Sequence, residues 1–451
     1  MIHQDLPFPD AQTQALFKSY YQEYAQRLEL GAARVILIAE EDYVRFFAAL
    51  LASVAHQKLT IIADPHWQSL EWKALFESIE PDLIFSQNPA LQALKLESPK
   101  DYSPWYGYIL LPTGGSSGTL KLSIHKWDSF LISSQASKAF LKQKKLSSLS
   151  VLPPWHISGL MPFLRAYFTG GYYTYRLPKD LSEEGLLSLS KATDSLSSEY
   201  FISLVPTLLK RVLHSTKLCE WLRGFRGIFV GGGPLLEPIL QSALEKSLPI
   251  LPTYGSTETA SMVSLHPLDT PLDLKKGYSG KLLPHTKLSP PLGSCAEQPS
   301  RLSLECESAF YGYYPSIPKK TQIFQTQDLA CVEEDKLYIQ GRQDAIIITG
   351  AKKVDPLEVE SALLQTKHIQ DCIVFSEPSL EWGEALSVLY VPSSPETPLD
   401  SIKDTLKNLL APYKIPKNWY PATHLPFNNR GKISPQALQS FIQNLSRNQS
   451  L

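Results

Sequence analysis

The first half of the chain alternates short apolar runs with longer amphipathic stretches. The runs VILIAE, LTIIAD and DLIFS, which begin at Val35, Leu59 and Asp82, predict buried strands. The stretches DYVRFFAALLASVAH and WQSLEWKALFESIE between them predict helices. Strands that alternate with helices form parallel sheets with crossover helices, so the pattern predicts an α/β fold.

Further runs extend this pattern toward residue 265. YGYILLP, residues 106–112, predicts a buried strand that leads into a Gly/Ser loop. We expect further strands at residues 150–152, 200–204 and 227–230, and helices at residues 208–214 and 237–244.

The composition changes over residues 265–299, which are rich in Pro, Leu, Gly and Lys. The alternating segments RLSLECESAFYGYY and KLYIQGR that follow are typical of antiparallel strands. A compact pattern then predicts helices at 356–365 and 399–410 and strands at 372–375 and 385–391. We expect a large N-terminal domain of parallel and mixed sheets with helices, residues 1–343, whose β-rich subdomain covers about 265–343. A hinge joins it to a small α+β C-terminal domain, residues 344–451.

Length and composition indicate an ordinary globular protein. The chain has 451 residues, 43% of them apolar, and its 43 Lys and Arg nearly balance its 44 Asp and Glu. This balance disfavours a disordered chain and a nucleic-acid partner.

The chain ends and the cysteines bear on location. Residues 1–9 lack the features of a targeting segment, and the longest apolar stretch, residues 46–55, is half a membrane span. The five cysteines are an odd number without a CxxC pair, so we expect free buried thiols. We therefore expect a cytoplasmic protein without a membrane span, and a homodimer stays open.

A loop rich in Gly, Ser and Thr follows the strand predicted at residues 106–112. Glycines bring backbone N–H groups close to an anion, hydroxyls add donors and a lysine adds charge, so the loop suits phosphate. It is not a Walker A loop, which ends in Gly-Lys-Ser/Thr. A surface loop is the alternative. The proposed phosphate-binding residues are Thr113, Gly114, Gly115, Ser116, Ser117, Gly118, Thr119 and Lys121.

This loop and four later motifs, read in order, resemble those of the adenylate-forming superfamily, which includes acyl-CoA synthetases, luciferases and peptide-synthetase adenylation domains. The later motifs are Tyr254-Gly-Ser-Thr-Glu258, Gln327-Asp328, Gly341-Arg342-Gln-Asp344 and a C-terminal PYKIP…LP…GKI that contains Gly431-Lys432. The resemblance implies an ATP-dependent, AMP-forming acid–thiol ligase that uses Mg²⁺ and CoA. Gly114 and Leu120 depart from the superfamily's usual Ser and Pro.

The resemblance also implies roles for single residues in adenylation. Lys432 reaches the carboxylate and the α-phosphate, Thr257 bonds the α-phosphate and Glu258 holds Mg²⁺. A helix N-cap at Thr257, with Glu258 in the first turn, is the alternative. Asp328 and Arg342 hold the ribose, unless they form only a surface ion pair. Nucleotide contacts also fall to Tyr254, Gly255, Ser256, Gly231, Gly232 and Gly233.

The alternative for Tyr254 is that it only packs in the core, and the alternative for residues 231–233 is a plain tight turn. The superfamily's hinge falls at Asp344, with a strand-end cap as the alternative. Its CoA-side loop falls at Gly350 and Lys352.

Two further segments bear on the acid substrate. Residues 153–165 and 203–207 resemble those of the o-succinylbenzoate:CoA ligase family of menaquinone and phylloquinone biosynthesis. The resemblance implies 2-succinylbenzoate as the acid, and the proposed acid-binding residues are His156, Ser158, Arg165 and Thr207. It also places His156 among the catalytic residues, as the side chain that gates the acyl pocket. A core position for His156 and a snorkelling surface side chain for Arg165 remain open. The alternative functions are a CoA synthetase for another carboxylic acid and a catalytically weak adenylate-binding protein.

Overall fold

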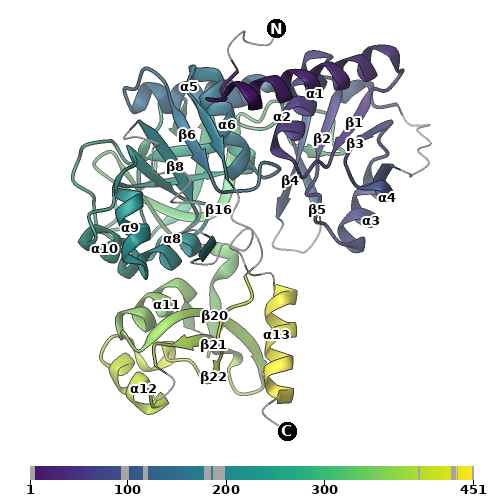
Figure 1. Ribbon diagram of the computed structural model, residues 1–451. Helices are drawn as coiled ribbons and strands as arrows, with labels where there is room; N and C mark the ends of the chain where they lie inside the picture. Colours follow the sequence, from purple (N-terminus) through teal and green to yellow (C-terminus); the bar gives the residue numbers. More distant parts are fainter. Residues whose placement is uncertain are drawn as a thin grey trace.

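The computed structural model describes residues 6–92, 101–114, 120–176, 184–185, 199–350, 352–394, 397–427, 433 and 435–448. Strands in these ranges form three sheets. Figure 1 shows the two larger sheets in one upper body and the third sheet beneath it.

The first sheet has the strand order β15-β5-β4-β2-β1-β3. Strands β1, β2, β3 and β4 are parallel, whereas β4 and β5 form an antiparallel hairpin and β15 pairs antiparallel to β5. The strands are β1 (Val35–Ile38), β2 (Leu59–Ile62), β3 (Leu83–Phe85), β4 (Ile109–Gly114), β5 (Leu120–His125) and β15 (Tyr313–Tyr314). The helices that precede or connect them are α1 (Ala11–Leu30), α2 (Tyr43–Ala55), α3 (Ser69–Ser78) and α4 (Pro89–Gln92).

The second sheet joins a parallel half to an antiparallel half, in the order β13-β14-β16-β17-β12-β11-β10-β9-β8-β6-β7. The parallel half is β6 (Ser147–Ser150), β7 (Tyr173–Tyr175), β8 (Tyr200–Leu204), β9 (Gly227–Val230) and β10 (Ile250–Ser256). The antiparallel half is β11 (Ser261–Leu265), β12 (Tyr278–Leu282), β13 (Thr286–Leu288), β14 (Ser300–Cys306), β16 (Ile323–Glu333) and β17 (Lys336–Arg342). The helices are α5 (Trp127–Phe140), α6 (Ile157–Thr169), α8 (Pro206–Leu213), α9 (Thr216–Arg223) and α10 (Glu237–Glu245).

A shared core lies between the first two sheets. The Phe47 ring of α2 stacks on the Phe163 ring of α6 at a centroid distance of 3.7 Å, and both side chains are fully buried. Burying such aromatic side chains is a dominant favourable term in folding. This packing holds the two sheets side by side, so loops from both reach the same region.

The third sheet contains β18 (Ile347–Thr349), β19 (Lys352–Val354), β20 (Ile369–Ser379), β21 (Gly383–Pro392) and β22 (Asn418–Pro421). Three helices accompany it, α11 (Pro356–Gln365), α12 (Leu399–Lys407) and α13 (Pro435–Asn448). The predicted α/β fold with a small α+β C-terminal region is confirmed. The domain boundaries at residues 265 and 344 stay predictions, and β11 and β12 continue the sheet across residue 265.

Two expectations need correction. The strand predicted at residues 150–152 lies at Ser147–Ser150, because a run of buried serines carries no apolar signal. The expectation of five free thiols is wrong, because Cys295 and Cys331 form a disulfide, while Cys219, Cys306 and Cys372 are free and buried. Ser294 and Val332, the neighbours of these two cysteines in the sequence, form an isolated β-bridge that holds the two chain segments side by side. No helix in the described ranges is long and apolar enough to cross a lipid bilayer.

Candidate functional site

The predicted nucleotide residues gather where parallel strands of the second sheet end. Strands β8, β9 and β10 are adjacent and parallel. Their carboxyl ends carry residues 205–207, Gly231–Gly233 and the Tyr254–Glu258 motif. This edge of a parallel sheet is where α/β folds bind ligands.

Glycine is required at the loop that follows β9. A Cβ atom on Gly231 would lie 2.3 Å from Thr253 Oγ1 of β10, and Gly232 has a φ of +80°, a left-handed conformation that favours glycine. The backbone of β9 and β10 therefore approaches closely here. Such an approach suits both predicted roles of this loop, a nucleotide contact and a tight turn.

Tyr254, Asp328, Arg342 and Asp344 form one chain of polar contacts. The Tyr254 hydroxyl donates to Asp328, and burial raises the pKa of this phenol, so it remains a neutral donor. Arg342 Nη1 lies 3.3 Å from Asp328 Oδ1, and its other two donors lie 2.8 Å from the two oxygens of Asp344. Three motifs far apart in the sequence therefore meet at the Asp328 carboxylate, which is the group proposed to bind the ribose.

Glu258 contacts the first sheet through Tyr313, whose ring lies near Lys121. The Tyr313 hydroxyl donates to Glu258 Oε1 at 2.7 Å, and Lys121 Nζ lies 5.8 Å from the centre of the Tyr313 ring. Strand pairing explains this arrangement, because β15 lies beside β5, which begins at the end of the predicted phosphate loop. Tyr313 was not predicted, since nothing in the sequence marks a contact across 55 residues.

A buried imidazole lies in this region. Burial, and to a lesser extent the Lys320 ammonium, lower the pKa of His125 to about 3, against a smaller opposing contribution from a hydrogen bond with the backbone of Thr257. His125 is therefore neutral.

Ser256, and not Thr257, precedes the single helical turn Thr257–Thr259, so the predicted N-cap alternative falls one residue earlier.

The structure describes only part of the remaining predicted phosphate and catalytic residues. Thr113 and Gly114 end β4, where they pair with Lys121 and Leu120. Outside the described residues lie Gly115, Ser116, Ser117, Gly118, Thr119 and Lys432.

Glu258 fits a magnesium ion that is shared with a nucleotide. Within the described ranges no group of three His, Cys, Asp or Glu side chains could hold a metal ion. Mg²⁺ is usually held by one or two carboxylates together with substrate phosphates. The Glu258 carboxylate suits this mode, because it is half-buried and accepts from Tyr313, whose strand β15 pairs with the strand that follows the predicted phosphate loop.

On the other side of the site, His156 forms a pair with a residue that was not predicted. His156 Nε2 lies 3.2 Å from Asp64 Oδ2, and His66 Nδ1 lies 3.3 Å from Asp64 Oδ1. His156 precedes α6 beside the second sheet, whereas Asp64 follows β2 of the first. The carboxylate therefore joins the two sheets and orients His156.

Arg165 is buried, so its predicted alternative as a snorkelling surface arginine is wrong. Its residue exposure is 2%, its guanidinium carbon lies 5.3 Å from the centre of the Phe229 ring, and Nη2 lies 3.4 Å from Ser203 Oγ. Ser158 lies in the first turn of α6 and Thr207 in the first turn of α8. After the roles predicted for their members, we call Tyr254, Glu258, Asp328 and Arg342 the nucleotide side, and His156 and Arg165, with the His156 partner Asp64, the acyl side.

The predicted CoA-side residues lie on the third sheet. Gly350 follows β18, and its N–H donates to Trp382 O at 3.0 Å. Lys352 begins β19, and its Nζ lies 4.4 Å from the centre of the Tyr413 ring. The structure thus places Gly350 against the backbone of Trp382, which precedes β21, and Lys352 against the ring of Tyr413, which lies in the helical turn Pro412–Lys414.

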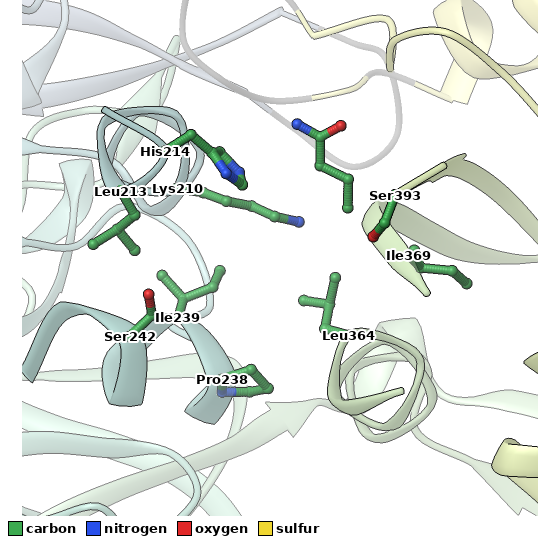
Figure 2. Close-up of a pocket in the computed structure, with 10 residues that line it drawn as sticks. Lys210, Leu213, His214, Pro238, Ile239, Ser242, Leu364, Ile369 and Ser393 are labelled. Atoms are coloured by element: carbon green, nitrogen blue, oxygen red, sulfur yellow. The ribbon is translucent and has the colours of Figure 1, made fainter. Parts of the chain in front are cut away.

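A cavity of about 450 Å³ separates helices of the upper body from the third sheet. Figure 2 shows Lys210 extending from α8 into this space, with Leu364 of α11 on the opposite wall. Lys210 Nζ lies 2.6 Å from Asp371 Oδ1 of β20. An ion pair therefore joins the two bodies beside this cavity.

Comparison with known proteins establishes the class of protein. The AMP-binding enzyme family matches residues 21–289, and the AMP-binding enzyme C-terminal domain matches residues 358–432. The chain belongs to the AMP-binding enzyme family.

Individual relatives narrow the comparison. The chain is 28% identical to a 2-succinylbenzoate--CoA ligase of Enterococcus faecalis over 84% of this chain and 78% of that protein. It is 27% identical to a 2-succinylbenzoate--CoA ligase of Bacillus subtilis over 83% of this chain and 76% of that one. Among solved structures, the o-succinylbenzoate CoA synthetase of Bacillus subtilis with its acyl-adenylate intermediate shares the fold. Its TM-score is 0.75 at 20% identity, covering 94% of this chain and 92% of that chain.

Proposed function

We propose that this protein joins 2-succinylbenzoate to CoA with ATP, through an acyl-adenylate and with release of AMP and pyrophosphate. The observation that carries the proposal is the match to 2-succinylbenzoate--CoA ligases along most of the chain. The geometry of the nucleotide side supports it, because the motif residues of an AMP-binding enzyme lie in mutual contact.

The chemistry explains why such a site is needed. A carboxylate is a poor acyl donor, and its attack on the ATP α-phosphate provides AMP as a leaving group for CoA. Positioning and neutralisation of charge carry this reaction. Asp328 and Arg342 hold the ribose, Tyr254 lies against the adenine, and Thr257 binds the α-phosphate. Glu258 would hold Mg²⁺ together with the ATP phosphates, and the ion would supply neutralisation of phosphate charge.

The third sheet belongs to the mobile part in this proposal. Rotation of residues 344–451 about Asp344 presents Lys432 for adenylation and then Gly350 and Lys352 for thioester formation. The bidentate contact between Arg342 and Asp344 supports a link between the ribose site and this hinge. The cytoplasm, where ATP and CoA are available, is the proposed location.

Acid-dependent exchange between ATP and labelled pyrophosphate tests the proposed function. We expect exchange with 2-succinylbenzoate, and CoA thioester formation when CoA is added. Exchange with a different carboxylic acid alone would indicate another CoA synthetase. No exchange with any acid would indicate an adenylate-binding protein without turnover.

A further inference from the structure

Lys210 and Asp371 form a shielded ion pair between the upper body and the third sheet. Lys210 Nζ, on α8, lies 2.6 Å from Asp371 Oδ1, on β20, and the two side chains are only 15% and 27% exposed. The Cys372 N–H also donates to Asp371 Oδ1 at 2.9 Å, which fixes the carboxylate on its strand. If one partner is replaced, the other becomes an unpaired charge shielded from water, which is unfavourable. Separation of the two bodies returns that charge to water, so such a replacement penalises only the arrangement in which the bodies touch.

Glu360 of α11 is a second acid whose charge would act on this pair. Burial raises the pKa of Glu360 to about 8, against an opposing hydrogen bond from the Val374 N–H, which lies 2.9 Å from Oε1. Glu360 is therefore mostly protonated at pH 7. Asp371 remains the carboxylate that pairs with Lys210.

The ion pair and the CoA-side loop lie at opposite ends of the β20–β21 hairpin. Ile369 and Ser393, at the open end, line the cavity against α8 and α10 (Figure 2). At the closed end, the Gly350 N–H donates to Trp382 O in the turn between the two strands. The 11 residues of β20, at roughly 3.3 Å each, separate the two ends by about 36 Å.

This geometry identifies which half-reaction the orientation suits. Helix α8 begins at Pro206, at the edge of the second sheet where the predicted nucleotide residues gather, and Lys210 lies four residues later, about 6 Å along the helix. The open end of the hairpin is thus close to that edge, and the closed end with Gly350 is far from it. Gly350 reaches the edge only if the third sheet turns, and that turn separates Asp371 from Lys210.

We propose that Lys210 and Asp371 are positioning residues that hold the third sheet in its orientation for adenylation, and that their ion pair opens before thioester formation. This inference rests on the proposed function and adds the contact that the rotation breaks. A contact made in one of two orientations favours that orientation, so its loss shifts the balance toward the other.

The experiment measures both half-reactions in charge variants of the pair. Lys210→Glu places two carboxylates face to face, so we expect acid-dependent pyrophosphate release with 2-succinylbenzoate to fall about 10-fold. Thioester formation from synthetic 2-succinylbenzoyl-adenylate and CoA should fall by less than about twofold or rise. Asp371→Lys should behave in the same way. The double variant Lys210→Glu/Asp371→Lys should recover most of the loss, because it restores the ion pair with its charges exchanged.

Two further variants serve as controls. Lys217→Glu makes the same charge change at an exposed lysine of α9 and should alter neither step. If Lys210→Glu fails to fold, Lys210→Gln, which only removes the charge, should show the same selective loss at about threefold.

Small-angle X-ray scattering of the ligand-free protein tests the orientation without any acid. The unmodified protein and the double variant should fit the arrangement in this structure, whereas Lys210→Glu should depart from it. A scattering curve that Lys210→Glu leaves unchanged would overturn the positioning role.

The kinetic outcomes separate this proposal from the proposed function. Equal losses in both half-reactions, without recovery in the double variant, would mean that the pair only stabilises the fold. A selective loss of thioester formation would contradict the assignment of this orientation to adenylation. If no acid supports exchange while the scattering responds as expected, the proposed function fails and the positioning pair stands.

Discussion

The nucleotide side and the acyl side of the site differ in how their charges are satisfied. On the nucleotide side, Asp328 already accepts from Tyr254 and lies beside Arg342, and Glu258 accepts from Tyr313. On the acyl side, the Arg165 guanidinium is buried with one weak polar contact. Protein groups thus pair the charges of the nucleotide side and of Asp64 and His156, whereas the buried Arg165 guanidinium has only a hydroxyl and an aromatic face as partners among the described residues.

Lys432→Ala should produce the largest effect, and it separates the two half-reactions. Negative charge converges near the α-phosphate during adenylation, where a lysine ammonium is most effective. We expect acid-dependent pyrophosphate release to fall at least ~100-fold, while synthetic acyl-adenylate and CoA still form thioester at a near-normal rate. Rapid-quench measurement of both steps checks this.

Gly350→Leu is the matched variant for the second step. A bulky side chain should obstruct the CoA-side loop, so thioester formation should fall while adenylation is retained. Equal losses in both steps for Lys432→Ala would contradict the rotation of the C-terminal region about Asp344.

Glu258→Gln should follow, because it removes one carboxylate from the nucleotide side with little change in shape. The amide still accepts from Tyr313 but holds Mg²⁺ weakly. We expect kcat/KM for ATP to fall about 30-fold and to recover partly at high Mg²⁺. Titration of activity with Mg²⁺ checks this.

Tyr313→Phe is the control, since it removes the hydroxyl and leaves the carboxylate. It should cost about fivefold, the size of one ordinary hydrogen bond. An unchanged Mg²⁺ dependence in Glu258→Gln would remove Glu258 from the metal site.

The arrangement around Asp328 predicts a smaller effect confined to ATP binding. Asp328→Ala should raise KM for ATP about 10-fold with little change in kcat, because a ribose anchor binds ground and transition states alike. Steady-state kinetics with each substrate varied in turn provide the measurement. A raised KM for the acid, with that for ATP unchanged, would place Asp328 on the acyl side.

The last prediction concerns stability rather than activity and contrasts two buried bases. His125 has lost its proton, since its pKa of about 3 lies below the ordinary 6.5, whereas Arg165 keeps its charge. At a pH between about 3, the pKa of His125 in the folded protein, and about 6.5, its pKa in the unfolded chain, the unfolded chain binds more protons than the folded one. The free energy of unfolding should therefore fall as the pH decreases from about 6.5 toward 3, by up to about 1.4 kcal/mol per pH unit.

His125→Phe removes this contribution, and its ring fits beside Phe130. Urea unfolding at pH 7 and pH 5 should show a smaller pH dependence for this variant than for the unmodified protein. His214→Gln alters an exposed histidine and serves as the control. An identical pH dependence in His125→Phe would mean that His125 is not held neutral by burial.

Local pattern predicted most of the elements correctly. Strands β8, β9 and β17 and helix α11 have the predicted bounds, since an apolar run or helical period ends at Gly, Pro or a charged residue. Helix α1 was not predicted, because only Phe17, Tyr24 and Leu28 of its 20 residues are buried. A helix that covers a core with so few residues carries a weak apolar period.

The site residues likewise divide into those that the sequence predicted and those that it did not. The resemblance to the adenylate-forming superfamily identified Tyr254, Asp328 and Arg342, which the structure places in contact. The partners Asp64 and Tyr313 were missed, because their contacts depend on how the two sheets pack. No local pattern encodes such contacts.

A crystal structure with a non-hydrolysable sulfamoyl analogue of 2-succinylbenzoyl-adenylate tests the contrast between the two sides most directly. The account predicts ribose hydroxyls on the Asp328 carboxylate, adenine against Tyr254 and the distal carboxylate paired with the Arg165 guanidinium. A distal carboxylate that lies in solvent or on another cation, with Arg165 still unpaired, would contradict it.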